Sequence, residues 1–259
     1  MSTILFSEIV FGPILSRRLG TSLGINLLPY DGKLCSFDCI YCECGLNKDF
    51  KTKTKLPNRK NVRLALSDKL ISLKTEGVEL DVITFAGNGE PTIHPDFHTI
   101  IDDTIELRDR FYPNSKISVL SNGMHLDKAK VVEALKKTDN PVLKLDSAFD
   151  TTIRLIDRPN SSEYSVARQV ERYKQFNGDF ILQTMFLKGI FEGCEIDNTT
   201  EKEVLRWLEL VSDLKPREVM IYTIDRETPV KGLQKVSIYD LQKIAERVEK
   251  LGIKTNVAG

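Results

Sequence analysis

Residues 82–91 read VITFAGNGEP, a short apolar run that leads directly into a glycine-rich turn closed by glutamate and proline. A near-continuous apolar run of this length is typical of a strand buried on both faces of a parallel sheet. Similar runs recur at residues 24–28, 117–121, 142–146, 180–186 and 219–224. The chain therefore predicts six buried strands of one sheet.

Helical patterns separate these strands. The clearest covers residues 237–251, where apolar side chains recur every three or four positions, Ser237 and Asp240 form a capping pair, and Gly252 is a stop signal. Weaker apolar stripes cover residues 62–73, 97–107, 126–135, 164–176 and 204–214. Six strand–helix units in series predict right-handed parallel crossovers, in either a doubly wound sheet or a curved, barrel-like one.

Polar side chains or glycines mark the carboxyl ends of the strands after the first. In parallel α/β folds this edge of the sheet binds ligands, because the loops that follow the strands converge there. The candidate ligand-binding residues at this edge are Gly87, Asn88, Gly89, Glu90, Ser121, Asn122, Asp146, Gln183 and Tyr222. Glycines among them permit positive φ or a close approach of the backbone to a ligand.

A long loop, residues 29–57, follows the first predicted strand and carries three thiols at the spacing C-x3-C-x2-C, namely Cys35, Cys39 and Cys42. A loop of that length in a compact domain is usually functional. A [4Fe–4S] cluster that is fully ligated by cysteine takes four thiolates. Three thiolates therefore predict a cluster with one open iron, which an exogenous ligand can occupy.

A structural zinc site is the alternative for this loop, with Cys44 as the fourth thiol after Cys35, Cys39 and Cys42. The protein would then be a zinc-stabilised binding module. Zinc sites usually pair two C-x2-4-C hooks from separate segments, and four thiols within ten residues make a strained tetrahedron. We therefore favour the iron–sulfur cluster and expect Cys44 and Cys194 to be free thiols.

The cysteine spacing, with the aromatic Tyr41 before the last thiol, and the Gly-Glu-Pro sequence after the second strand resemble the radical S-adenosylmethionine (SAM) superfamily. The resemblance implies a partial (β/α)6 TIM-like barrel with a [4Fe–4S] cluster on Cys35, Cys39 and Cys42. It implies that SAM chelates the open iron and is cleaved reductively to a 5′-deoxyadenosyl radical, which abstracts hydrogen from a substrate.

The same resemblance implies contacts with SAM for the candidate residues. Gly87 and Gly89 would lie near the ammonium group of the methionine moiety, with Asn88 at the first position of the more usual Gly-Gly-Glu-Pro motif. Glu90 would support the methionine-side or the ribose contacts. Ser121, Asn122 and Gln183 would lie near the ribose or the carboxylate. Tyr41 and Tyr222 would lie near the adenine.

A narrower likeness extends over residues 11–13, 16–20, 22–25, 87–95 and 222–226. These segments are similar to iron–sulfur oxidoreductases related to the wyosine tRNA-modifying synthases. True wyosine synthases are expected to carry further cysteines before the radical motif, whereas this sequence has none before Cys35. Two classes of substrate therefore stay open. The first is RNA or a nucleotide; the second is a protein or peptide, if the chain is a glycyl-radical-enzyme activase or a peptide-modifying enzyme.

The length of 259 residues and 41% hydrophobic content suit one radical SAM domain over residues 1–259, with an N-terminal extension at 1–20. Basic and acidic residues both number 37, so only a local patch could bind RNA. Residues 48–63, from Lys48 to Arg63, form the candidate patch, with seven basic side chains against one acidic.

The sequence contains neither a secretory signal nor a run of roughly 18 apolar residues, so we expect a cytoplasmic protein with no membrane contact. We also expect an external one-electron donor, of the flavodoxin or ferredoxin type, because the sequence shows no second redox centre.

Overall fold

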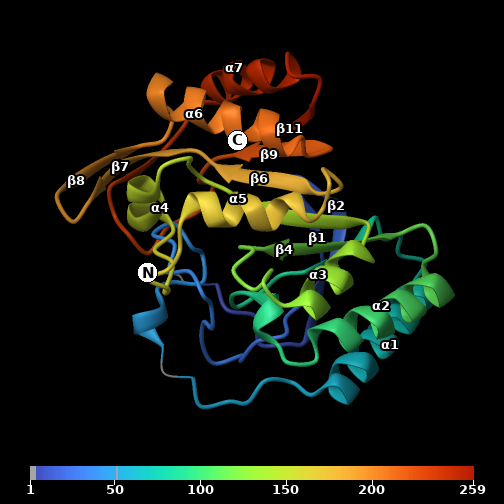
Figure 1. The fold of residues 1–259 in the computed structure, drawn as a ribbon. Helices are drawn as coiled ribbons and strands as arrows, with labels where there is room; N and C mark the ends of the chain where they lie inside the picture. Colours follow the sequence, from blue (N-terminus) through green and yellow to red (C-terminus); the bar gives the residue numbers. More distant parts are fainter. Residues whose placement is uncertain (1–3, 51) are drawn as a thin grey trace.

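The computed structural model describes residues 4–50 and 52–259, and its main feature is a curved sheet (Figure 1). In the described part of the chain this sheet has eight strands in the order β1-β2-β3-β4-β5-β6-β9-β11. Their bounds are β1 Val10–Ser16, β2 Gly20–Ile25, β3 Val82–Phe85, β4 Lys116–Ser121, β5 Asn140–Lys144, β6 Ile181–Met185, β9 Glu218–Tyr222 and β11 Lys254–Ala258. Strands β1 and β2 pair antiparallel, and every other neighbouring pair is parallel.

The six predicted strands correspond to β2, β3, β4, β5, β6 and β9, so the prediction of a partial parallel barrel is confirmed. The bounds of the first strand were wrong, because β2 ends at Ile25 rather than running to residue 28. The Asn26 side chain causes this ending: its Oδ1 accepts a hydrogen bond of 3.2 Å from the amide of Leu28, which makes a local turn.

Two strands of the large sheet were not predicted. Strand β1 lies within the expected N-terminal extension, and Ile14 and Leu15 on it are exposed, so it lacks a buried apolar run. Strand β11 contains three polar residues in succession, Lys254, Thr255 and Asn256, as an edge strand tolerates. The sheet thus extends beyond the six predicted strands at both edges.

The two edges of the large sheet contact each other through side chains. The guanidinium of Arg17 donates a 3.1 Å hydrogen bond to the carbonyl of Gly259, and the amide of Asn256 donates one of 3.3 Å to the carbonyl of Arg18. In the described residues β11 pairs with β9 alone. We call this contact between the β1–β2 turn and β11 the seam.

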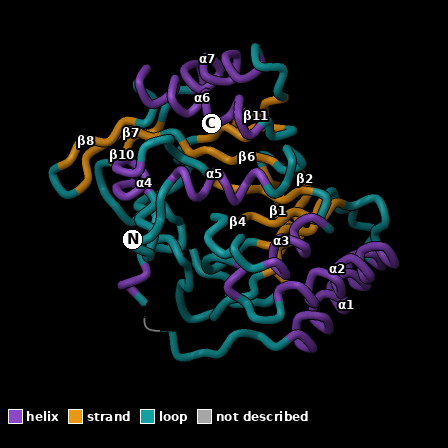
Figure 2. Tube along the Cα trace, in the orientation of Figure 1, coloured by secondary structure: helices purple, strands orange, loops and turns teal. Residues whose placement is uncertain are grey.

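Helices cover the sheet on its outer side (Figures 1 and 2). The α-helices are α1 Arg59–Thr75, α2 Phe97–Phe111, α3 Ala129–Lys136, α4 Asp150–Ile156, α5 Val166–Lys174, α6 Glu201–Leu214 and α7 Ile238–Glu249, and the 3-10 helices are η1 Asn47–Asp49 and η2 Pro91–Ile93. All six predicted helices are present; the short α4 was not predicted. As predicted, the hydroxyl of Ser237 caps α7 by accepting a 3.1 Å hydrogen bond from the amide of Asp240.

Two hydrophobic clusters matter for the site. The larger one fills the space between sheet and helices and contains Trp207, whose ring packs edge-on against Phe186 at 5.4 Å. The smaller one includes Ile40, Tyr41 and Tyr222 and lies under the cysteine loop. The loop therefore has an apolar support at the carboxyl ends of β6 and β9.

A second, three-stranded sheet lies beside the large one (Figure 2). Its order is β10-β7-β8, with β7 Leu187–Phe191, β8 Cys194–Asp197 and β10 Leu233–Lys235. It was not predicted, because β7 follows β6 after a single residue and both fall in one apolar stretch. Among the described residues, no helix combines the length and the apolar character that a membrane span requires.

Candidate functional site

The cysteine loop is attached to the end of β3 by a short parallel bridge. The amide of Leu34 donates a 2.8 Å hydrogen bond to the carbonyl of Asn88, and the amide of Glu90 donates one of 3.2 Å to the carbonyl of Leu34. Gly89 makes this approach feasible: its φ is +140°, and a Cβ there would lie 1.9 Å from the carbonyl oxygen of Leu34. The bridge fixes the position of Cys35, the next residue.

A buried lysine, Lys33, connects two parts of the same loop. The Lys33 ammonium, 1% exposed, lies 3.2 Å from Oδ1 of Asp38 and donates a 2.9 Å hydrogen bond to the carbonyl of Gly45. Burial lowers its pKa, but the thiolates of Cys42 and the other two cysteines raise it by more, so the net pKa is raised. Lys33 therefore places a positive charge beside the three thiols.

Each predicted ligand has a distinct environment. Cys35 Sγ accepts hydrogen bonds from the amide of Phe37 at 3.4 Å and from Nδ2 of Asn122 at 3.7 Å, and Cys39 Sγ lies 3.2 Å from Nζ of Lys144. Burial raises the pKa of Cys35 to about 12 and also raises that of Cys39. A hydrogen bond from Cys44 lowers the pKa of Cys42 to about 6.

These surroundings fit an iron–sulfur cluster. Soft thiolates are its usual ligands, and N–H donors and positive charges near the sulfurs offset the negative charge of the ligated cluster. Cluster binding must displace the thiol protons that burial favours on Cys35 and Cys39.

In residues 4–50 and 52–259, no three His, Cys, Asp or Glu side chains converge on a single ion position. The structure therefore gives no support to the four-thiol zinc alternative. A cubane cluster does not need such convergence, because each of its cysteines ligates a different iron. Cys44 is buried, with its thiol 3.3 Å from the carbonyl of Gly87, and Cys194 is exposed on β8.

Glu90 organises the ends of β3 and β4. Its carboxylate is 2% exposed and accepts hydrogen bonds from the hydroxyl of Ser121 at 2.9 Å and from the amide of Asn122 at 2.7 Å. Thr92 donates two more, through its amide and its hydroxyl. Burial raises the pKa of Glu90 against the lowering effect of these donors. These hydrogen bonds fix the Ser121 hydroxyl and the Asn122 amide beside Glu90.

A buried charged network follows β5. Lys144 Nζ lies 3.0 Å from Asp146 and 2.6 Å from Asp157, and it also contacts the hydroxyl of Tyr41, which donates to Asp146. Burial raises the pKa of Asp157, and the neighbouring charge of Asp146 raises it further against the lowering effect of Lys144, to about 7. The network joins the cysteine loop to the end of β5 at Cys39.

The remaining predicted residues lie in two places. Nε2 of Gln183 donates a 2.7 Å hydrogen bond to the hydroxyl of Tyr222, whose ring faces the guanidinium of Arg18 at 4.4 Å. Asn88 differs from the others, because its side chain is turned away from the strand ends. It binds the backbone of Phe6 at 2.9 Å and the carbonyl of Pro29 at 2.8 Å.

Four charged participants were not among the predicted site residues: Lys33, Asp38, Lys144 and Asp157. The only signal for Lys33 in the sequence is its position two residues before the predicted ligand Cys35. The role of Asp157 had no local signal, because it follows α4 and reaches Lys144 only in the folded chain.

A family model described as the radical SAM superfamily matches residues 31–230. A UPF0026 protein of Synechocystis sp. is 32% identical over 230 residues, which cover 87% of this chain and 78% of that protein. A protein of Brachyspira hyodysenteriae named GTPase Obg is 31% identical over 246 residues, which cover 93% of this chain. This chain spans 33% of the length of that Brachyspira protein.

Solved structures share the fold at low identity. A radical SAM methyltransferase from Sphaerobacter thermophilus superposes with a TM-score of 0.67 and 13% identity, covering 92% of this chain and 65% of that one. TYW1 with a lysine-pyruvate adduct gives a TM-score of 0.60 and 14% identity, covering 90% of this chain and 74% of that one. The chain belongs to the radical SAM superfamily, whose enzymes use a [4Fe–4S] cluster and S-adenosylmethionine.

Proposed function

We propose that Cys35, Cys39 and Cys42 hold the [4Fe–4S] cluster of this enzyme. The observation that carries the proposal is the attachment of their loop to the carboxyl edge of a curved parallel sheet, with N–H donors or an ammonium at the sulfurs of Cys35 and Cys39. When bound, cluster and SAM supply a 5′-deoxyadenosyl radical that abstracts hydrogen from the substrate. The domain that does this would cover residues 1–259.

The residues at the strand ends would bind SAM. Backbone carbonyls near Gly87 and Gly89 suit its ammonium group, and Ser121 and Asn122 suit its ribose or carboxylate, held in place by Glu90. Asp146 and Gln183, after β5 and on β6, would add polar contacts. Tyr41 and Tyr222 are buried aromatic rings of one apolar cluster, which suits the adenine. Asn88 would contribute through its backbone, because its side chain is engaged elsewhere.

Enzymes of this superfamily need an electron donor and a substrate. We propose a donor of the flavodoxin or ferredoxin type, which would deliver one electron at a time to the cluster.

Anaerobic reconstitution with iron and sulfide tests the cluster assignment. The wild-type chain should bind about four irons and release 5′-deoxyadenosine from SAM when dithionite is added. Cys39→Ala should lose both properties, because one ligand and its contact with Lys144 disappear. Cys194→Ala is the matched control and should retain both, since this thiol is exposed on β8. Equal iron content in the two variants would refute the assignment.

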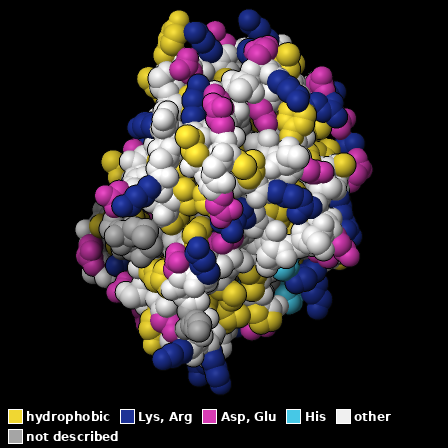
Figure 3. Space-filling view, turned by 90° about the vertical axis from the view of Figure 1, so that its left-hand side faces the viewer, with side chains coloured by type: hydrophobic (Ala, Val, Ile, Leu, Met, Phe, Trp, Pro, Cys, Tyr) yellow, Lys and Arg dark blue, Asp and Glu magenta, His cyan; other side chains and the backbone are white. Residues whose placement is uncertain are grey.

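The basic stretch 48–63 gives RNA less support than the sequence suggested. Arg59 and Arg63 bind Asp103 at 2.7 and 2.9 Å, and Arg63 also binds Glu106 at 2.6 Å. Lys51 lies outside the described residues. On the face drawn in Figure 3, basic and acidic side chains are interspersed rather than gathered by sign. These observations favour a substrate that is recognised by a confined site rather than by a broad basic surface.

A further inference from the structure

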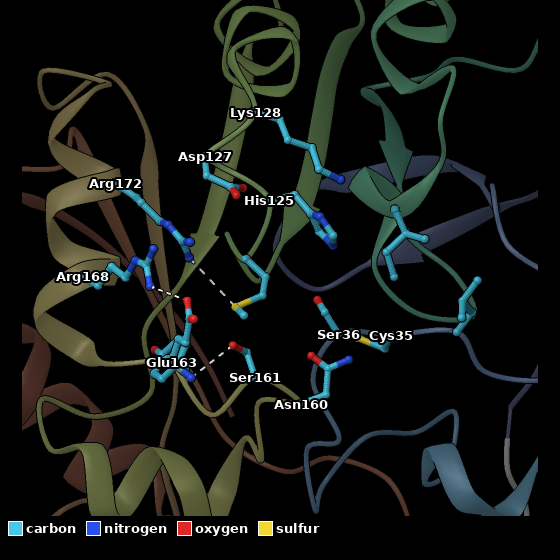
Figure 4. Close-up of a pocket in the computed structure, with 14 residues that line it drawn as sticks. Cys35, Ser36, His125, Asp127, Lys128, Asn160, Ser161, Glu163, Arg168 and Arg172 are labelled. Carbon is cyan, nitrogen blue, oxygen red and sulfur yellow. Dashed lines mark hydrogen bonds and ion pairs between the residues drawn. The ribbon is translucent and has the colours of Figure 1, made fainter.

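A cavity of about 490 Å3 opens beside Cys35 and Ser36 (Figure 4). Its walls come from the cysteine loop, the segments that follow β4 and α4, and helix α5. Two arginines of α5, Arg168 and Arg172, point into it from the side opposite Cys35. The cavity therefore places cationic side chains across from a predicted cluster ligand.

The cationic side chains outnumber the acidic ones. Lys128, Arg168 and Arg172 line the cavity, against Asp127 and Glu163. Arg168 and Arg172 are four residues apart, so they share one face of the helix. Arg168 forms an ion pair of 3.0 Å with Glu163.

Arg172 has no such neutralising partner. Its Nη1 lies 3.3 Å from Oε1 of Gln169 and 4.0 Å from Sδ of Met124, and no carboxylate of the described residues lies within 4.0 Å of it. Lys128, on the opposite rim, likewise forms no ion pair with any part of the chain that the structure describes. Asp127 also lines the cavity and forms no ion pair among the described residues, so these two cations face one carboxylate. The remaining net positive charge of the confined space attracts an anion.

His125 adds an unpartnered polar atom. Its Nε2 is buried and has no hydrogen-bond partner among the described residues, although the ring points toward the cavity. Buried polar atoms in folded proteins usually have a partner, but Nε2 lies below the accessible surface, so a ligand in the cavity would reach it only after the ring turned. Burial also lowers the pKa of His125, and a bound anion would oppose that effect.

The size and remaining lining of the cavity set the class of ligand. A volume of about 490 Å3 is far larger than a single inorganic anion and lies in the range of small-molecule sites. Ile93, Met124 and Tyr164 supply an apolar portion, and Asn160 and Ser161 supply hydrogen-bonding groups. This combination suits an organic molecule of up to mononucleotide size with one strongly charged end.

We propose that this cavity binds the substrate of the radical reaction, a small phosphate ester. Arg172 and Lys128 hold its phosphate, and its organic part extends toward Cys35. Arg is well suited to phosphate, because its guanidinium can donate two parallel hydrogen bonds. The proposal deepens the proposed function and rests on it, since the organic part must lie near the cluster.

Calorimetric titration of the reconstituted holoenzyme with SAM present tests the proposal. The probes are inorganic phosphate, ribose 5-phosphate and ribose. The wild type should bind the two phosphates and not ribose. Arg172→Ala should weaken binding of ribose 5-phosphate about tenfold or more, as loss of a charge-assisted hydrogen bond predicts. Lys174→Ala removes the same charge from the same helix outside this cavity, and should change the affinity less than about twofold.

Lys128→Ala is a second variant on the opposite rim and should also weaken the binding of ribose 5-phosphate. In both cavity variants, SAM affinity and dithionite-driven release of 5′-deoxyadenosine should match the wild type. A parallel loss of SAM affinity in Arg172→Ala would assign the cavity to SAM and overturn the proposal. Absence of ribose 5-phosphate binding to the wild type, or unchanged binding of ribose 5-phosphate in both cavity variants, would overturn it too. Failure of the wild type to cleave SAM would instead contradict the proposed function.

Discussion

Replacement of Gly89 by alanine should destabilise the protein strongly, because this residue lets the cysteine loop approach β3. At φ +140° a residue with a side chain is strained by about 1–3 kcal/mol. The added Cβ would lie 1.9 Å from the carbonyl oxygen of Leu34, a backbone atom. The bridge must separate, which loses two hydrogen bonds of about 0.5–1.5 kcal/mol each. We therefore expect a loss of about 2–6 kcal/mol.

Gly77→Ala is the matched control. Gly77 also has a positive φ, +72°, but a Cβ there meets no atom within 4 Å, so we expect a loss of about 1 kcal/mol. Urea unfolding of the cluster-free protein, followed through the fluorescence of the only tryptophan, Trp207, measures both losses. Gly89→Ala should also bind less iron after reconstitution, because Leu34 directly precedes Cys35. Equal unfolding midpoints for the two variants would refute the reasoning.

Two further predictions concern the network at Lys144. Lys144→Met should lower the free energy of unfolding by about 3–5 kcal/mol, because Asp146 and Asp157 would remain buried without their counter-ion; a loss below about 1 kcal/mol in urea unfolding would contradict this. The pKa of Asp157 is raised to about 7 in the folded state, above its unfolded value of about 3.9. Its contribution to stability is therefore complete below about pH 4 and is lost as the pH rises through about 7. Urea midpoints across this window should fall less steeply for Asp157→Asn than for the wild type, and parallel curves would exclude the carboxyl as the cause.

The strands and helices that could be predicted are those whose burial is evident from the local pattern of apolar residues. Strand β3 is four consecutive buried residues, three of them apolar, and α7 begins after a serine that caps it. Strand β11 was not predicted for two reasons. Its hydrogen-bonding partners lie on β9, more than thirty residues earlier, and Lys254 and Thr255 are polar, so no apolar run marks the strand. Edge strands are defined by what they pair with, and pairing is not visible locally.

The residues of the candidate site also fall into a group that could be predicted from the sequence and a group that could not. Cys35, Glu90 and Asn122 could be predicted together, because parallel strands bring their carboxyl ends to one edge and the three residues then make direct or shared contacts. The direction of a side chain within a turn is set by tertiary contacts. The amide of Asn88 therefore holds Phe6 and Pro29 instead of facing the strand ends, and Asp157 joins the network from a helix with no recognisable pattern.

The seam gives the barrel a line of mechanical weakness. Elsewhere around the wall, separation of two neighbours requires the rupture of a backbone ladder. Between the β1–β2 turn and β11 the described residues form no ladder. Side chains alone connect the two edges there: the hydrogen bonds of Arg17 and Asn256, each about 1 kcal/mol, beside the Arg17–Asp225 ion pair and the Arg18–Tyr222 contact. We therefore expect any thermal widening of the wall to begin there, because the seam can open without loss of backbone pairing.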